Sequence, residues 1–292
     1  LNLYKDKQLF KDMFSYAGSD MIGNIAVLAQ GQGLNLLLNV FFGPVVNAAR
    51  GIVYQVQGSI TQFSNNFMTA VRPQIIKLYA EGKTKEMMQL VKQSSCFSYY
   101  LMWMISLPIC LEANYVLKLW LGEYPEYTAN FLYLIIVLCL IQTIKTPRST
   151  VFHATGRLKL VNIVVGSILC AAFPLAYLFL KLGGSPESVF WAANITLVLS
   201  EIASIIILKK YIKYSVADYL MAVYVRCAVV TAISFALSYL LYNLFLGESF
   251  LRLISTGILT TLSVVLSSLY MGMNRSMRMK IYSIIAGKMK RI

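Results

Sequence analysis

Apolar segments long enough to cross a membrane recur along the whole chain. An α-helix needs about 20 mainly apolar residues to span a hydrocarbon core of ~30 Å. The pattern predicts eight such spans, separated by short connectors: residues 14–41, 47–72, 95–114, 129–150, 160–181, 188–208, 219–244 and 251–272. The first two are semi-polar, whereas the other six are plainly apolar. The predicted fold class is therefore an all-α polytopic membrane protein.

Polar residues of the first two spans fall on single helical faces, at about 100° per residue. The first stripe consists of Asp20, Asn24, Gly31, Asn35 and Asn39, and the second stripe of Asn47, Gly51, Tyr54, Gln55, Gly58, Thr61, Gln62, Asn65, Thr69 and Arg72. Polar groups that face lipid are costly, so these stripes are expected to face protein or a water-filled cavity. Amides and hydroxyls suit a hydroxyl-rich solute. The structural alternative is helix–helix packing, in which Gly51 and Gly58 allow close approach and the amides pair across helices.

Charged residues inside the spans are expected to have partners. If the first two spans form a hairpin about residue 46, Asp20 and Arg72 lie at equal depth. Glu201 and Arg226 likewise lie at equal depth about the loop near Lys213. Each pair could be a structural ion pair. Alternatively, the carboxylates could titrate during transport, with H⁺ or Na⁺ as the coupling ion.

A basic cluster stands at one end of the fourth span, where Lys145 and Arg148 precede the sole histidine, His153, and Pro147 disturbs the helix. The cluster could bind an anionic head group. Anchoring of the span end at the membrane surface is the simpler interpretation. One histidine without a second ligand does not indicate a metal site.

Composition excludes several classes of protein. Of 292 residues, 58% are hydrophobic and 13% are charged, against about 45–50% and about 25% in soluble domains. This excludes a water-soluble globular enzyme, a disordered chain and a small disulfide scaffold. The apolar runs also argue against a nucleic-acid binder despite the net charge of +14. The five cysteines have no metal-binding spacing and enzyme motifs are absent, so no catalytic residue, metal or cofactor is expected.

The basic residues predict the orientation, because lysine and arginine favour cytoplasmic loops. With a cytoplasmic N-terminus, 20 of the 26 lysines and arginines fall on the cytoplasmic side. Both ends of the chain then lie inside. The last segment, residues 273–292, places apolar residues near one helical face among basic ones. It is expected either to lie on an anionic leaflet as an amphipathic helix or to be a basic end that only sets topology.

Four short segments carry a resemblance to a known family. They are FGPVVNAARG (Phe42–Gly51), VRPQIIKLYAEG (Val71–Gly82), LKLWLG (Leu117–Gly122) and ATGRLK (Ala154–Lys159). Over about residues 10–215 the chain resembles bacterial polysaccharide-biosynthesis flippases. These are the O-antigen (Wzx-type) exporters of the multidrug/oligosaccharidyl-lipid/polysaccharide superfamily, which have a MATE-like fold. One departure is the segment Gly184–Ser188, where many relatives have a glycine- and alanine-rich entry before the twelfth helix.

The resemblance implies a fold of two six-helix lobes, often followed by two extra helices. Residues 1–213 would be the second lobe and residues 214–272 the extra pair, with the N-terminal lobe missing. The absent initiator methionine agrees with this expectation.

The function implied is export of an undecaprenyl-pyrophosphate-linked oligosaccharide by alternating access in the bacterial cytoplasmic (inner) membrane. Partners would be that lipid-linked oligosaccharide, the phospholipid membrane, the missing lobe and glycan polymerase machinery, but no nucleic acid. Arginine suits pyrophosphate because its guanidinium is bidentate. The candidate binding residues are Asp20, Asn24, Asn35, Asn39, Arg50, Tyr54, Gln55, Gln62, Asn65, Arg72, Lys145 and Arg148, with Asp20, Glu201 and Arg226 as candidates for coupling or ion pairing.

Three alternatives remain open at this point. A cation-coupled multidrug exporter of the same superfamily would need an acidic, aromatic-lined cavity, whereas the stripes are rich in amides. A membrane glycan polymerase or ligase would need a large outer loop, yet the longest outer connector is about residues 114–128. A structural or assembly subunit is the third.

Overall fold

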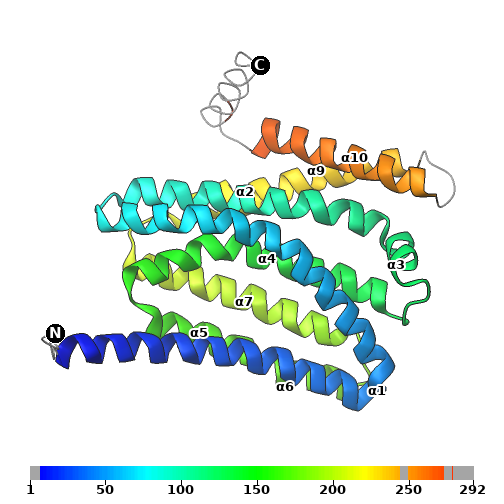
Figure 1. The fold of residues 1–292 in the computed structure, drawn as a ribbon. Helices are drawn as coiled ribbons and strands as arrows, with labels where there is room; N and C mark the ends of the chain where they lie inside the picture. Colours follow the sequence, from blue (N-terminus) through cyan, green and yellow to red (C-terminus); the bar gives the residue numbers. More distant parts are fainter. Residues whose placement is uncertain (1–6, 244–248, 273–277, 279–292) are drawn as a thin grey trace, which may run out of the picture.

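Helices joined by short connectors make up the part of the chain that the computed structural model describes, residues 7–243, 249–272 and 278 (Figure 1). No strand occurs among these residues. The elements are α1 (Lys7–Ala80), α2 (Thr84–Leu111), α3 (Ala113–Leu121), α4 (Thr128–Thr155), α5 (Leu158–Cys170), α6 (Ala172–Lys181), α7 (Ser188–Tyr211), α8 (Val216–Leu220), the π-helix η1 (Met221–Val225), α9 (Arg226–Tyr242), α10 (Phe250–Ser267) and the π-helix η2 (Ser268–Gly272).

Seven helical segments of the described chain are long and apolar enough to cross a membrane. They are Gly23–Ala80, Thr84–Leu111, Thr128–Thr155, Leu158–Lys181, Ser188–Tyr211, Val216–Leu240 and Phe250–Gly272. The chain is thus a multi-pass all-α membrane protein, as predicted. The expected spans 14–41 and 47–72 both fall within α1, which consists of two helices joined across a kink at Gly43.

Gly43 divides α1 into two arms. Its backbone angles, φ 78° and ψ −174°, lie in a region that is essentially restricted to glycine. Pro44 follows, and its fixed φ and missing N–H suit the first position of a helix. Figure 1 shows that the chain turns back at this point, so that the two arms diverge from it. We call residues 7–42 the first arm and residues 44–80 the second arm.

The first arm packs closely on α5 and α6 because small residues meet there. A methyl group at Gly166 would lie 3.2 Å from Ala26 Cβ, and one at Gly33 would lie 2.7 Å from Phe173 Cδ2. Such residues let helix backbones approach each other in a membrane, where no hydrophobic effect drives helices together.

The fifth expected span, residues 160–181, forms two helices instead of one. α5 ends at Cys170 and α6 begins at Ala172. Pro174 has no N–H to donate to the carbonyl of Cys170, so the helical hydrogen-bond series is interrupted there.

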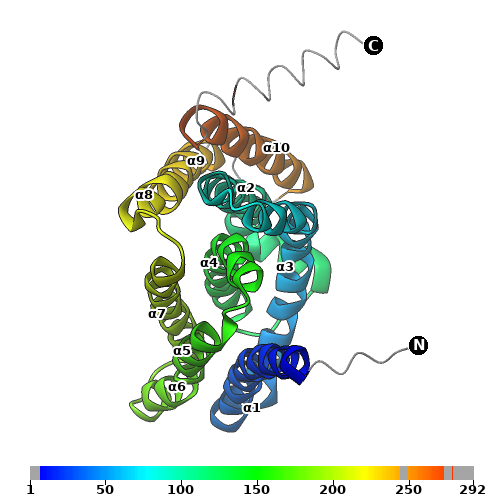
Figure 2. The same cartoon turned by 90° about the vertical axis from the view of Figure 1, so that its left-hand side faces the viewer.

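The last helices pack on α2 and on each other (Figure 2). Hydroxyl groups mediate this packing. The Tyr99 and Thr231 hydroxyls lie 2.7 Å apart, and Trp103 Nε1 donates to Ser234 Oγ at 2.8 Å. Polar side chains joining helices in this way are common in membrane proteins. The predicted basic amphipathic tail, residues 273–292, lies outside the described residues except for Arg278.

Candidate functional site between α1, α4 and α7

The second stripe lies on an open face of the second arm. Tyr54, Gln55, Gln62, Asn65 and Arg72 are all exposed. A methyl group at Gly51 or Gly58 would meet no atom within 4 Å. The packing alternative requires close approach at these two glycines and amides that pair across helices, whereas the Gln62 amide bonds Asn66 of the same helix. The second stripe is therefore not a packing seam between helices of the described chain.

One side of the second stripe borders a pocket of about 270 Å³ between the second arm and α4. Its lining is mostly hydroxyl and amide side chains: Tyr54, Gln57, Thr61, Ser64 and Asn65 from α1, with Gln142, Thr143 and Thr146 from α4. The contribution of α4 to this pocket was not predicted from the sequence. Its signal was the recurrence of polar residues every three or four positions, at Gln142, Thr146, Ser149 and His153.

The other side of the second stripe borders a wide groove of about 840 Å³. Gln55 and Gln62 line it together with the apolar side chains of Phe63, Ile109 and Trp120. The second stripe thus separates a polar pocket from a largely apolar groove.

Arg50 joins the two arms of α1 near their junction. Its guanidinium donates to Asn35 Oδ1 at 3.0 Å and to the carbonyl oxygen of Gly31 at 2.9 Å. It also lies 4.1 Å from the centre of the Tyr54 ring. Three predicted site residues, Asn35, Arg50 and Tyr54, are therefore brought together. Asn39 is exposed nearby on the first arm.

Asp20 and Asn24 line a third pocket, of about 170 Å³, with Lys145, His153 and Ser204. Asn24 Nδ2 donates to Asp20 Oδ2 at 3.4 Å. Within the described chain Asp20 forms no ion pair with Arg72, which corrects the expected pairing. The physical reason is that the arms diverge from Gly43, so equal distance from the turn does not bring residues into contact.

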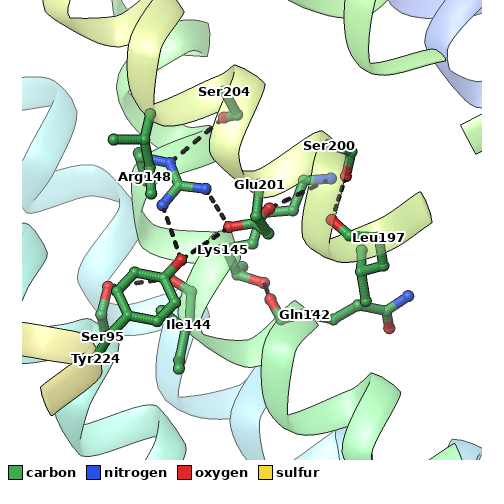
Figure 3. A network of polar contacts seen from close by, with 12 residues as sticks. Ser95, Gln142, Ile144, Lys145, Arg148, Leu197, Ser200, Glu201, Ser204 and Tyr224 are labelled. Carbon is green, nitrogen blue, oxygen red and sulfur yellow. Dashed lines mark hydrogen bonds and ion pairs between the residues drawn. The ribbon is translucent and has the colours of Figure 1, made fainter. Parts of the chain in front are cut away.

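A buried ion pair between α4 and α7 lies next to this pocket (Figure 3). Arg148 Nη2 bonds Glu201 Oε2, and the two side chains are 0% and 4% exposed. Lys145 Nζ lies 3.8 Å from Glu201 Oε1. Glu201 thus pairs with Arg148 and Lys145 of α4, whereas Arg226 was the expected partner. Arg226 lies on the next span along the chain, but α7 packs on α4 and so brings Glu201 to Arg148 and Lys145.

Further polar groups complete the surroundings of Arg148. Its Nε donates to Ser204 Oγ at 3.4 Å, and its Nη1 to the Tyr219 hydroxyl at 3.4 Å. Tyr224 donates its hydroxyl hydrogen to Glu201 Oε2 at 3.2 Å. A buried charge is tolerated when it is paired and hydrogen-bonded. Arg148 therefore fastens α4 to α7 and α8, and the sequence gives no local signal for its tyrosine and serine partners.

Outside the spans, the connector before α7 is held by Glu187. Burial raises the pKa of this carboxyl. Hydrogen bonds with Ser185 and Asn130 together lower the pKa by more than burial raises it, so the pKa lies below its usual value. The Asn130 Nδ2 to Glu187 Oε1 distance is 2.8 Å. This contact ties the start of α7 to the start of α4.

No group of three or more histidine, cysteine, aspartate or glutamate side chains in the described residues could hold a metal ion. Comparisons with protein-family models, curated proteins and solved structures find no match to this chain. The likeness to flippases therefore rests on the four segments that carry it.

Proposed function

We propose that the protein belongs to a transporter that moves an undecaprenyl-pyrophosphate-linked oligosaccharide from the inner to the outer leaflet of a bacterial cytoplasmic membrane by alternating access. One observation carries the proposal. Eight of the ten residues of the second stripe are exposed along a helix in a candidate membrane span, with open space beside its glycines. Polar side chains that face lipid have no hydrogen-bond partner, which is energetically costly. This face is therefore expected to contact a polar solute or a water-filled path.

The length of the second stripe favours a continuous transport path across the membrane and not a single localised binding site. From Tyr54 to Arg72 a helix rises about 27 Å, close to the thickness of the hydrocarbon core. Sugar hydroxyls both donate and accept hydrogen bonds, and the amides and hydroxyls of the second stripe do the same. A glycan could therefore exchange one set of hydrogen bonds for another along the way.

The protein contacts of the basic residues limit which of them are available to bind the pyrophosphate. Arg50 and Arg148 are already bonded to protein groups. Arg72 is exposed at the end of the second stripe, and the Lys145 side chain is 22% exposed. Lys145 also forms an ion pair with Glu201, so we assign the pyrophosphate contact to Arg72.

The open face would need a cover in the membrane. We propose that the cover is the N-terminal lobe implied by the resemblance. The cavity would then lie between the two lobes, with the second stripe as part of one wall.

The test uses the complete gene product in the bacterium that encodes it. Gln62→Ala and Arg72→Ala each remove one hydrogen-bonding side chain from the second stripe. We expect several-fold less glycan at the cell surface with unchanged amounts of protein in the membrane. Gln32→Ala is the matched control, because Gln32 is exposed on the first arm outside both stripes. Wild-type glycan levels in both stripe variants would contradict the assignment.

Asp20 favours a second candidate, a cation-coupled multidrug exporter. It is an acidic residue at the edge of the first membrane segment, and it lines a pocket with Phe152 and Leu169. Accumulation of a fluorescent cationic drug in cells with and without the protein separates the two. Lower accumulation with unchanged surface glycan would favour the drug exporter.

A further inference from the structure

A separate pocket of about 430 Å³ lies where the start of α2, the connector between α7 and α8, η1 and the end of η2 meet. It shares no lining residue with the three pockets of the candidate site. Basic residues near span ends normally point into open water. Here several of them converge on one concavity.

The lining of this pocket carries an excess of positive charge. Among the described residues, Lys85, Lys92, Lys213 and Arg226 line it, against a single acid, Asp218. Lys92 and Asp218 form an ion pair that ties α2 to α8. In the part of the chain that the structure describes, the other three cations form no ion pair.

Arg226 is the most informative of the three. It lies within the candidate span Val216–Leu240, about 15 Å along the helix from Val216. It is half-buried and lines the pocket. A guanidinium inside a span is costly without an anionic partner, and such residues commonly mark binding sites.

Both π-helices of the described chain border this same pocket. η1 ends immediately before Arg226 and contributes Ala222, while η2 contributes Gly272. A methyl group at Gly272 would lie 2.5 Å from the Tyr100 hydroxyl oxygen, so the wall is closely fitted. π-Helical turns are rare and occur frequently at functional sites. The position of both π-helices at this pocket indicates a binding site.

The uncharged part of the wall combines polar side chains, among them Gln89 and Gln93, with an apolar portion. Met88, Phe97 and Tyr100 line the pocket beside the cations. Next to it, Met221 and Val225 of η1 are 63% and 43% exposed, on a surface suited to lipid chains. The site therefore matches a ligand with an anionic head and an apolar body.

We propose that this pocket binds the phosphate of an anionic phospholipid, with Arg226, Lys213 and Lys85 around the phosphate and the apolar portion of the wall against the glycerol and the first chain carbons. Arginine holds phosphate oxygens bidentately, and lysine contributes a point charge. Basic pockets between membrane helices bind lipid head groups in this way. The proposal is independent of the transport function.

The experiment titrates the purified complete protein in detergent with a fluorescent phosphatidylglycerol. We expect Arg226→Gln and Lys213→Gln each to weaken binding about tenfold, the effect of losing one charge-assisted hydrogen bond. Lys210→Gln is the matched control, because Lys210 is exposed three residues from Lys213 but does not line the pocket. It should leave the affinity unchanged.

Competition identifies the source of the phosphate. Unlabelled phosphatidylglycerol should displace the probe, whereas phosphatidylcholine and inorganic phosphate should not at the same concentration. Equal displacement by inorganic phosphate would assign the pocket to a soluble anion and overturn the proposal. Equal affinity of the wild type and both pocket variants would overturn it as well. If Arg226→Gln fails to fold, Lys213→Gln and Lys85→Gln carry the test, because both lysines are exposed.

Discussion

Individual charged side chains of this protein differ in how fully other protein groups satisfy them. Arg148 is completely buried and bonds groups on α7 and α8. Arg50 bonds two groups on the first arm. Arg72, by contrast, is exposed. The satisfied arginines stabilise the fold, and the exposed one is available to a ligand.

The buried pair gives a prediction at the residue scale. Glu201→Gln leaves the Arg148 guanidinium buried without a counter-charge, which costs about 3–5 kcal/mol. We expect a clearly lower midpoint of thermal unfolding in detergent. Glu86→Gln, at an exposed position on α2, should leave the midpoint unchanged.

A double replacement distinguishes the charge from the packing. Arg148→Met with Glu201→Leu removes both charges, and apolar residues of similar volume often restore stability at such sites. The double variant should therefore unfold at a higher temperature than Glu201→Gln. Wild-type stability in Glu201→Gln would show that the pair contributes little.

Among the elements, α1 depends most on one position. The turn at Gly43 decides that the first arm packs on α5 and α6 while the second arm packs on α2 and α4. Pockets bordered by Asp20 and by Tyr54 consequently lie on opposite arms. The candidate site is therefore a consequence of one backbone conformation.

Two glycines with different backbone angles test this at the element scale. Gly43 has ψ −174°, in the glycine-only region, whereas Gly156 caps α4 with φ 68° and ψ 3°, a conformation that asparagine tolerates. Gly43→Ala and Gly43→Asn should both lower the free energy of unfolding by about 1–3 kcal/mol. Gly156→Asn should be nearly neutral. Because open space surrounds Gly43, a steric clash cannot explain the loss. Rescue of stability by asparagine at residue 43 would contradict the backbone argument.

At the scale of the whole molecule, the connectors lie in two groups. Figure 1 shows the connectors from α1 to α2, from α4 to α5 and from α7 to α8 at one end, with those entering α4 and α7 at the other. Most lysines and arginines of the connectors belong to the first group. The arrangement has the asymmetry that the positive-inside rule requires.

Single cysteines in a cysteine-free background test the orientation. We expect cysteines at Lys83 and Lys213 to react with a membrane-impermeant maleimide only after the cells are opened. Cysteines at Glu123 and Ser185 should react in intact cells. Labelling of all four in intact cells would disprove the predicted topology, and the reverse pattern would place both ends outside.

The two polar stripes and the helical class were within reach of the sequence because both follow from local regularities. Span length and helical period depend only on residues close together in the sequence. Gln55 and Gln62, for example, are seven residues or about two helical turns apart and therefore share a face. The candidate site was only half predictable. Tyr54 and Asn65 came from the second stripe, but Gln142 and Thr146 belong to a helix whose rotation depends on all its neighbours.

By itself, then, the sequence determined that the chain is helical, crosses a membrane several times and carries two polar stripes in its first segments. The tertiary structure decided which charges meet. Glu201 pairs with Arg148 and not with Arg226, and Arg226 instead joins Lys85 and Lys213 at one pocket. The physical reason is that helix period is a property of one segment. Contacts between segments depend on how every helix tilts, turns and packs.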